Sequence, residues 1–114
     1  MARFYRYETI DIPLIFTPAG ILNNYRHIMV SIAQDGMTQI DKDETQLSID
    51  TEQNTITLSL SQEETGKFAG GEDGKPRKAK IQVNIYYEST GRDVSTIGYI
   101  DVYDNLYKKV ITDE

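Results

Sequence analysis

The sequence predicts an all-β domain of about seven antiparallel strands with one short helix. Apolar and polar residues alternate with a period of two over most of the chain, which gives each strand one buried face and one wet face. Residues typical of tight turns separate the alternating segments. Long apolar runs joined by long helices, the signature of a parallel sheet, do not occur. Strands at this spacing are typical of a sandwich or a barrel.

The alternating segments follow one another from the first tenth of the chain to its last strand. They cover residues 10–16, 28–32, 47–50, 55–60, 81–88 and 99–103. Pro13 lies in the first segment and lacks a backbone donor, so we expect that segment at a sheet edge or a strand start. Gly98 interrupts the alternation late in the chain. We expect a bulge there that turns both Ile97 and Ile100 toward the core.

Short turn sequences join these segments. Asp35-Gly36 lies between two alternating runs and is a strong hairpin signal, because both residues tolerate positive φ. Gln53-Asn54 predicts a second tight hairpin, and Thr90-Gly91 predicts a turn after the segment 81–88.

The predicted helix covers residues 61–68, where the alternation stops. Ser61 and Glu64 have the spacing of a capping box, in which each side chain accepts a hydrogen bond from the other residue's backbone N–H. Gly66 ends the helix after one or two turns. We expect Phe68 to enter the core, and the helix to carry the chain from one sheet to the other.

The remaining segments are interpreted as loops and a tail within a single domain of 114 residues. Residues 70–78 contain three glycines, one proline and no apolar residue, which predicts a long flexible loop between two strands. The core is expected over residues 8–104. Residues 105–114 are interpreted as a C-terminal extension.

Composition excludes several classes of function. The chain has no cysteine, which excludes disulfides, cysteine–zinc sites and a thiol nucleophile. Its net charge is −6, so a groove that binds the phosphates of a nucleic acid is not expected. Neither a signal peptide nor a membrane span is apparent, so we expect no membrane partner and synthesis in a cytoplasm.

No residue pattern predicts catalytic, cofactor or metal-binding residues. His27 is the single histidine and falls on the polar face of a strand, so we expect it at the surface or against a partner. Asp41, Asp43 and Glu44 lack the glycine and distal glutamate of a calcium loop, and are interpreted as a solvated hairpin tip. The basic run at 75–78 is interpreted as a solvated loop, with a phosphate or acidic-partner contact as the alternative.

Tyrosine is unusually frequent, with 8 residues against 3 phenylalanines and no tryptophan. By alternation Tyr86, Tyr99 and Tyr103 point outward from late strands. Outward tyrosines can anchor a protein interface. The alternatives are cross-strand packing on a half-wet sheet and stacking on a sugar.

The order of motifs in the second half resembles the N-terminal domain of the phage baseplate upper protein family. The motifs are L-S-Q-E-E-T at 60–65 with Phe68, A-K-I-Q-V-N-I at 79–85, Gly91-Arg92 and I-D-V-Y-D-N-L at 100–106. The resemblance implies an immunoglobulin-like β-sandwich that serves as an adaptor in a tail or baseplate. It transfers no functional residue, because the matched positions have roles in the fold. No stalk or receptor-binding module follows Leu106, so we expect a small assembly component.

These observations predict a non-enzymatic structural or assembly protein of a phage or prophage tail. We expect other tail or baseplate proteins as partners, a homo-oligomer within a symmetric assembly, and a location first in the host cytoplasm and then in the virion tail. The expected contacts are sheet edges and tyrosine-bearing faces, with an arm at the C-terminus. The predicted interface residues are Tyr86, Tyr99, Tyr103, Asn105, Leu106 and Tyr107. A carbohydrate- or protein-binding module that acts outside a particle is the alternative, and an enzyme built on His27 or a carboxylate pair is the third.

Overall fold

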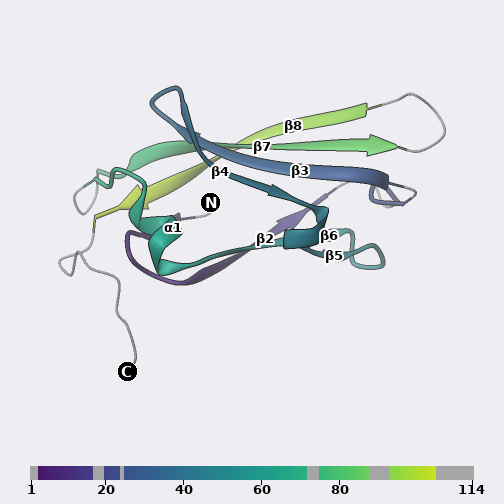
Figure 1. Cartoon of the computed structure of the whole chain (residues 1–114), viewed down its shortest axis with the longest axis horizontal. Coiled ribbons are helices and arrows are strands. Elements are labelled where there is room, and N and C mark those ends of the chain that lie inside the picture. Colours follow the sequence, from purple (N-terminus) through teal and green to yellow (C-terminus); the bar gives the residue numbers. More distant parts are fainter. Residues whose placement is uncertain (1–2, 17–19, 24, 72–74, 88–92, 105–114) are drawn as a thin grey trace.

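The computed structural model of the chain describes residues 3–16, 20–23, 25–71, 75–87 and 93–104. These residues form two facing β-sheets that contain eight strands, with one short α-helix and one 3-10 turn (Figure 1). The prediction of an all-β antiparallel sandwich with one short helix is confirmed.

The larger sheet has five strands in the order β1-β8-β7-β3-β4, and the smaller has three in the order β2-β6-β5. Their bounds are β1 Arg3–Tyr5, β2 Ile10–Ile15, β3 Tyr25–Gln34, β4 Met37–Asp43, β5 Ser48–Asp50, β6 Thr55–Leu60, β7 Arg77–Tyr87 and β8 Asp93–Tyr103. All pairings are antiparallel except that of β1 with β8. With β1 and β4 set aside, β2-β6-β5 and β3-β7-β8 correspond to strands B-E-D and C-F-G of an immunoglobulin sandwich.

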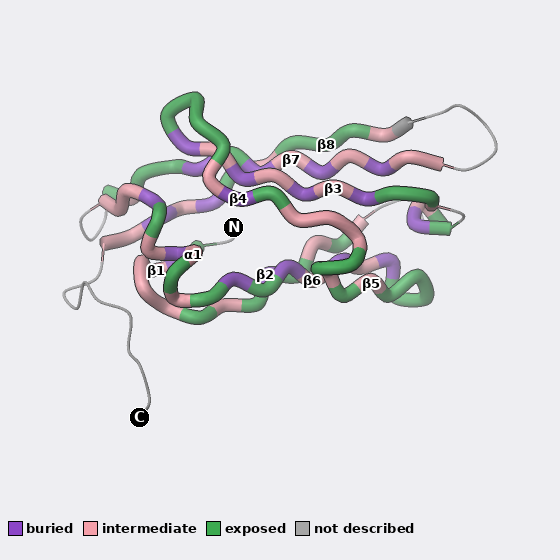
Figure 2. Tube along the Cα trace, viewed as in Figure 1, coloured by how far each residue is buried: buried purple, intermediate pink, exposed green. Residues whose placement is uncertain are grey.

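The core lies between the two sheets and is built from one face of each strand. Buried positions alternate with more exposed ones along β3 and β7 (Figure 2), as a strand's period of two requires. Among the described residues, the buried hydrophobic ones are Phe4, Ile12, Leu22, Ile28, Val30, Ile32, Ile40, Ile56, Leu58, Leu60, Phe68, Ala79, Ile81, Val83, Ile85, Ile100 and Val102. Phe4 belongs to β1, a strand that the alternation did not predict and that precedes the expected start of the core at residue 8.

Local turn signals are confirmed where the structure describes them. Asp35 and Gly36 have φ of 54° and 81° and join β3 to β4, the positive pair that a two-residue hairpin requires. Asn54 has φ of 54° in the turn between β5 and β6. Pro13 lies in β2, which pairs with β6 alone among the described strands and therefore forms a sheet edge as predicted. The predicted turn at Thr90-Gly91 lies outside the described residues.

The helix α1 (Gln62–Gly66) has the predicted capping box and connects the smaller sheet to the larger one. The Glu64 N–H donates to Ser61 Oγ at 3.2 Å, and the Ser61 N–H donates to Glu64 Oε1 at 2.9 Å. Phe68 follows the helix and is buried edge-on against Phe4, with ring centroids 5.3 Å apart. The helix is therefore fixed at its start by polar caps and beyond its end by an aromatic anchor.

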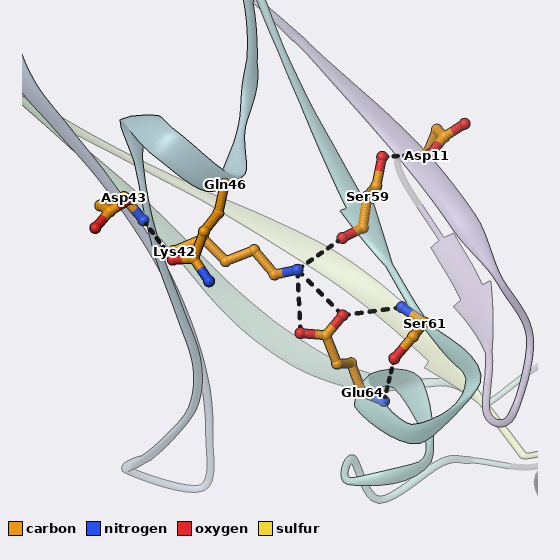
Figure 3. A network of polar contacts seen from close by, with 7 residues as sticks. All are labelled: Asp11, Lys42, Asp43, Gln46, Ser59, Ser61 and Glu64. Carbon is orange, nitrogen blue, oxygen red and sulfur yellow. Dashed lines mark hydrogen bonds and ion pairs between the residues drawn. The ribbon is translucent and has the colours of Figure 1, made fainter.

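A polar network closes the sandwich along β4 (Figure 3). Lys42 lies on this edge strand, and its side chain crosses to the opposite sheet with only 13% of its surface exposed. Its Nζ donates to the Ser59 carbonyl oxygen at 3.0 Å and to Glu64 Oε1 at 3.1 Å. One lysine thus links β4, β6 and α1.

Two local predictions are wrong. The pairing of β7 with β8 runs without a shift through Gly98, because neither strand carries an extra residue there. Ile100 is buried, but Ile97 points away from the core and is 51% exposed. The predicted flexible loop at 70–78 is also shorter than expected. Arg77 and Lys78 belong to β7, and Gly71 bridges to Tyr103.

Candidate interaction face

The outer face of the larger sheet carries the predicted interface tyrosines. Alternation directs every second side chain of β3, β7 and β8 away from the smaller sheet. The outward residues at the centre of this face are Met29, Ser31, Ala33, Lys78, Lys80, Gln82, Asn84, Ser95, Ile97, Tyr99 and Asp101. Most of these side chains are polar, so the central part of the face offers hydrogen-bonding groups to a partner.

Tyr99 is the most exposed tyrosine on this face, with 54% of its surface accessible. It lies in a cross-strand row with Lys80 and Ala33. Beside it is a shallow depression of about 330 Å³, lined by residues of the β3–β4 hairpin and of β7, among them Ser31 and Gln82. A large, rigid aromatic side chain next to small residues and a depression is the arrangement found at interface hot spots.

The three predicted tyrosines share the face but are not neighbours. Tyr86 lies six residues along β7 from Lys80, the residue paired with Tyr99, which is about 20 Å at the rise of a strand. Tyr103 lies four residues beyond Tyr99 and stacks on Tyr5, with ring centroids 5.2 Å apart. The geometry therefore favours Tyr99 as the centre of the candidate face. Asn105, Leu106 and Tyr107 lie outside the described residues, and their interface role stays a prediction.

Ion pairs at one end of the face involve the basic run that was interpreted as a solvated loop. Lys78 Nζ lies 2.9 Å from Asp101 Oδ1, and Arg77 Nη2 lies 2.7 Å from Asp35 Oδ2. Exposed pairs of this kind contribute about 0–1 kcal/mol to stability. They can exchange partners at low cost, so a docking protein could engage these charges without disturbing the fold.

The acidic cluster is part of β4 and the following 3-10 turn, so its interpretation as a hairpin tip is wrong. Asp43 caps this turn, η1 (Glu44–Gln46), by accepting from the Thr45 N–H at 2.9 Å. Asp41 Oδ1 accepts from Ser31 Oγ at 2.5 Å. Hydrogen bonds from the Thr45 hydroxyl and N–H hold the pKa of Asp43 below its usual value.

His27 is exposed, as predicted, and forms a pair with the cluster. Its Nδ1 lies 2.5 Å from Glu44 Oε1. This hydrogen bond is the main reason that the pKa of Glu44 is lowered. Within the described part of the chain, no group of three or more histidine, cysteine or acidic residues could hold a metal ion.

A second surface feature, which the sequence did not reveal, lies on the opposite side of the sandwich from β4. A groove of about 350 Å³ separates the edge of β2 from the inner face of β7 and β8. Its lining includes Ile15, which is the last residue of β2, and Phe16, which follows it. Thr96 and Gly98 of β8 line the other side. Ile15 is 76% exposed. The sequence feature that points to this groove is the pair of small inward residues Thr96 and Gly98, since neither can fill the space between two sheets.

Comparison of the chain with models of known protein families gives no match, and a search of curated proteins gives none. None of the described helices is long and apolar enough to cross a membrane. Function is therefore inferred from the surface geometry together with the sequence resemblance.

Proposed function

We propose that the chain is a non-enzymatic structural or assembly component of a phage or prophage tail. In this proposal it binds other tail proteins through the outer face of its larger sheet. The resemblance of about residues 8–107 to the N-terminal domain of the baseplate upper protein family, which is better from Asn54 on, supports the tail assignment. The observation that carries the mode of action is the half-exposed ring of Tyr99 on a largely polar face beside a depression.

Binding at this face would rely on burial of apolar surface and on hydrogen bonds to a partner, and it would involve no chemical reaction. The Tyr99 ring supplies apolar area and a hydroxyl, while Ser31 and Gln82 supply hydrogen bonds around it. The net charge of −6 would keep the free protein soluble before it meets its partners.

The tail role is tested by inducing the source strain, sedimenting the lysate and quantifying this chain in the particle fraction by mass spectrometry. We expect the chain at a fixed stoichiometry with tail proteins. Its presence in the soluble fraction alone, while particles form, would overturn the structural role. That result would favour an assembly chaperone or the independent binding module. Binding to a glycan array that is lost in Tyr99→Ala would identify the binding module.

The docking face is tested by comparing Tyr99→Ala with Met37→Ala. Both remove a large exposed apolar side chain from the larger sheet, since Met37 is 67% exposed on β4. A hot-spot tyrosine contributes about 2 kcal/mol or more to binding. We therefore expect Tyr99→Ala to reduce incorporation into particles at least about tenfold, while Met37→Ala leaves it unchanged. Equal incorporation of both variants would contradict the face.

The C-terminal arm is tested by truncation after Asp104. The fold retains its last anchors in this variant, because Arg6 Nη1 lies 3.1 Å from Asp104 Oδ1 and the Asp104 N–H donates to the Gly71 carbonyl oxygen at 2.8 Å. We expect unchanged circular dichroism and thermal unfolding, with weaker incorporation into particles. An unfolded product would contradict the assignment of residues 105–114 to an arm.

A further inference from the structure

Strand β8 leaves most of one edge without a partner among the described residues. One side of the strand pairs with β7 over residues 93–102. The other side pairs only with β1, over residues 101–103. Asp93 is the first residue of the strand. The free edge that follows it, at residues 94–100, is about 24 Å long at the rise of an antiparallel strand. Its backbone N–H and C=O groups form a template for another strand.

The other long edges of the two sheets carry features that oppose strand addition. Strand β2 contains Pro13, which lacks an N–H. Strand β4 has a register shift opposite Ile32 and Ala33, and it carries the inward-pointing charge of Lys42. Strand β5 has only three residues. The free edge of β8 reads V-S-T-I-G-Y-I, with no charge, no proline and no bulge.

Exposed apolar side chains lie along this same edge. Ile97 is 51% exposed at the middle of the free stretch, and Tyr99 follows on the same face. Directly beneath the edge lies the groove that Ile15, Thr96 and Gly98 line. A strand edge without a partner, with exposed apolar side chains on one side and a groove lined mainly by apolar residues on the other, has the features of an interaction site.

We infer that the free edge of β8 pairs antiparallel with the same edge of a second copy, about a two-fold axis at Ile97. The stretch 94–100 is centred on residue 97, so all seven of its residues pair in this register. The pairing stops before Asp93, because Arg3 of β1 already lies beside Asp101. It joins two five-stranded sheets into one of ten strands. Such a self-complementary contact is the usual geometry of a homodimer.

The side chains along the edge are complementary to themselves in this register. Tyr99 lies opposite Ser95 of the second copy, Val94 opposite Ile100, and Thr96 opposite Gly98. Each large residue thus meets a smaller one, and Ile97 meets its own copy. The second copy is favoured over a charged partner because the stretch has no charge to attract one, in a chain whose net charge is −6. Asp101, which follows the stretch, is paired with Lys78.

The pairing goes beyond the proposed function, because it is a property of the isolated chain and joins strand edges rather than sheet faces. A strand added to β8 also extends the larger sheet over the mouth of the groove beside Ile15. Dimerisation therefore removes exposed apolar surface on both sides of the strand.

The absence of cysteine from the chain allows a direct test of the register by disulfide trapping. Facing residues in an antiparallel pair have Cα atoms about 4.5–5.5 Å apart, within the range that a disulfide needs. In Ile97→Cys the two thiols face each other. In the matched control Ser95→Cys, the two substituted positions are offset by four residues, about 14 Å. We expect Ile97→Cys to form a covalent dimer under mild oxidation at least tenfold faster than Ser95→Cys. Equal rates would overturn the register.

Sedimentation velocity of the unmodified chain tests the dimer itself. We expect twice the monomer mass at high concentration. Ile97→Lys and Ile97→Glu should each weaken the dimer more than tenfold, because like charges meet on the axis, and a mixture of the two variants should restore it. Met37→Lys, the same change at a distant exposed position, should leave it unaffected. A monomer at all concentrations would overturn the inference. Because these tests use purified protein, they are independent of the chain's presence in particles.

Discussion

The space between the two sheets is closed at one long side of the sandwich, along β4, and open at the other, along β8. On the β4 side, Lys42 reaches across the space between the sheets and binds Ser59 and Glu64 (Figure 3). On the β8 side, the space between the sheets is a groove with the exposed residues Ile15 and Ile97 at its margin. Both sides are built from edge strands of the same domain, so the difference lies in the residues that each edge carries.

The two sides show that one sandwich can have one edge that opposes further strand pairing, at β4, and one that lacks such protection, at β8. An inward-pointing charge on an edge strand opposes pairing with other strands, because any added strand must leave that charge satisfied. Lys42 meets this condition through Glu64 and the Ser59 carbonyl within its own chain. The edge of β8 lacks such a device and presents uncharged backbone. Because Lys42 opposes strand addition at β4, the pairing that we infer at β8 would not compete with pairing at the opposite edge.

The largest effect is expected from removing the anchor of the helix that carries Glu64. Phe68→Ala deletes a buried ring from its contact with Phe4 and leaves a cavity beneath α1. Large-to-small changes of this type cost about 3–5 kcal/mol. We expect a loss of that size in the free energy of unfolding by urea, and a smaller loss, about 1.5 kcal/mol, for Phe68→Leu. Equal stability of the Phe68→Ala variant and the unmodified chain would show that α1 does not need this anchor.

The Lys42 bridge is expected to have the next largest effect. Lys42→Met keeps most of the apolar stem but leaves Glu64 and the Ser59 carbonyl without their shared donor. Hydrogen bonds to charged groups contribute about 1.5–3 kcal/mol, so we expect a loss in that range by urea denaturation. The matched control is Lys80→Met on the exposed outer face of β7, which should change stability by less than about 0.5 kcal/mol. Similar losses in both variants would contradict a special role for the β4 side.

Acid is expected to weaken the same bridge. Partial burial by itself raises the pKa of Glu64, but hydrogen bonds from Ser61 and Lys42 and the charge of Lys42 outweigh it, so its pKa is lowered. A lowered pKa in the folded state stabilises the fold above the unfolded pKa, about 4.3 for glutamate, and this stabilisation is lost as the pH falls through the folded value. We expect the chain to be more stable than Glu64→Gln at pH 7 and to lose that advantage in acid. Because Asp43 and Glu44 also have lowered pKa values, only the difference between the two proteins measures Glu64. A difference in stability between the two proteins that stayed constant from pH 7 into acid would contradict a lowered pKa of Glu64.

Features with local signals could be predicted from the sequence. The hairpin at Asp35-Gly36 and the capping box of Ser61 and Glu64 depend on a few neighbouring residues, and the outward direction of Tyr99 follows from strand parity alone. The inward direction of Lys42 was available in the same way, because it lies two residues from the buried Ile40. A lysine in such a position is easily assigned to the wet face by its charge.

Features that depend on distant pairing could not be predicted. Strand β1 has three residues, too few to alternate visibly, and it exists because it pairs in parallel with the far end of the chain. The distance between Tyr86 and Tyr99 depends on the register of β7 with β8, which no residue in the sequence specifies. Gly98 was interpreted as a bulge because apolar Ile97 was assumed to be buried. The unbroken register shows instead that an isoleucine can mark an exposed edge.

The smallest effect on stability is expected on the open side. Ile15→Ser removes a side chain that is 76% exposed, so little apolar surface returns to water on unfolding. We expect a change in the free energy of unfolding within about 0.5 kcal/mol. Ile12→Ser, on the same strand but in the core, should be strongly destabilising. If Ile15→Ser were comparably destabilising, Ile15 would belong to the core of the single chain, and the groove would be closed in solution. A neutral result would mean that the Ile15 side chain is not needed for folding and stays available for contact with a second copy, as pairing of β8 edges over the groove requires.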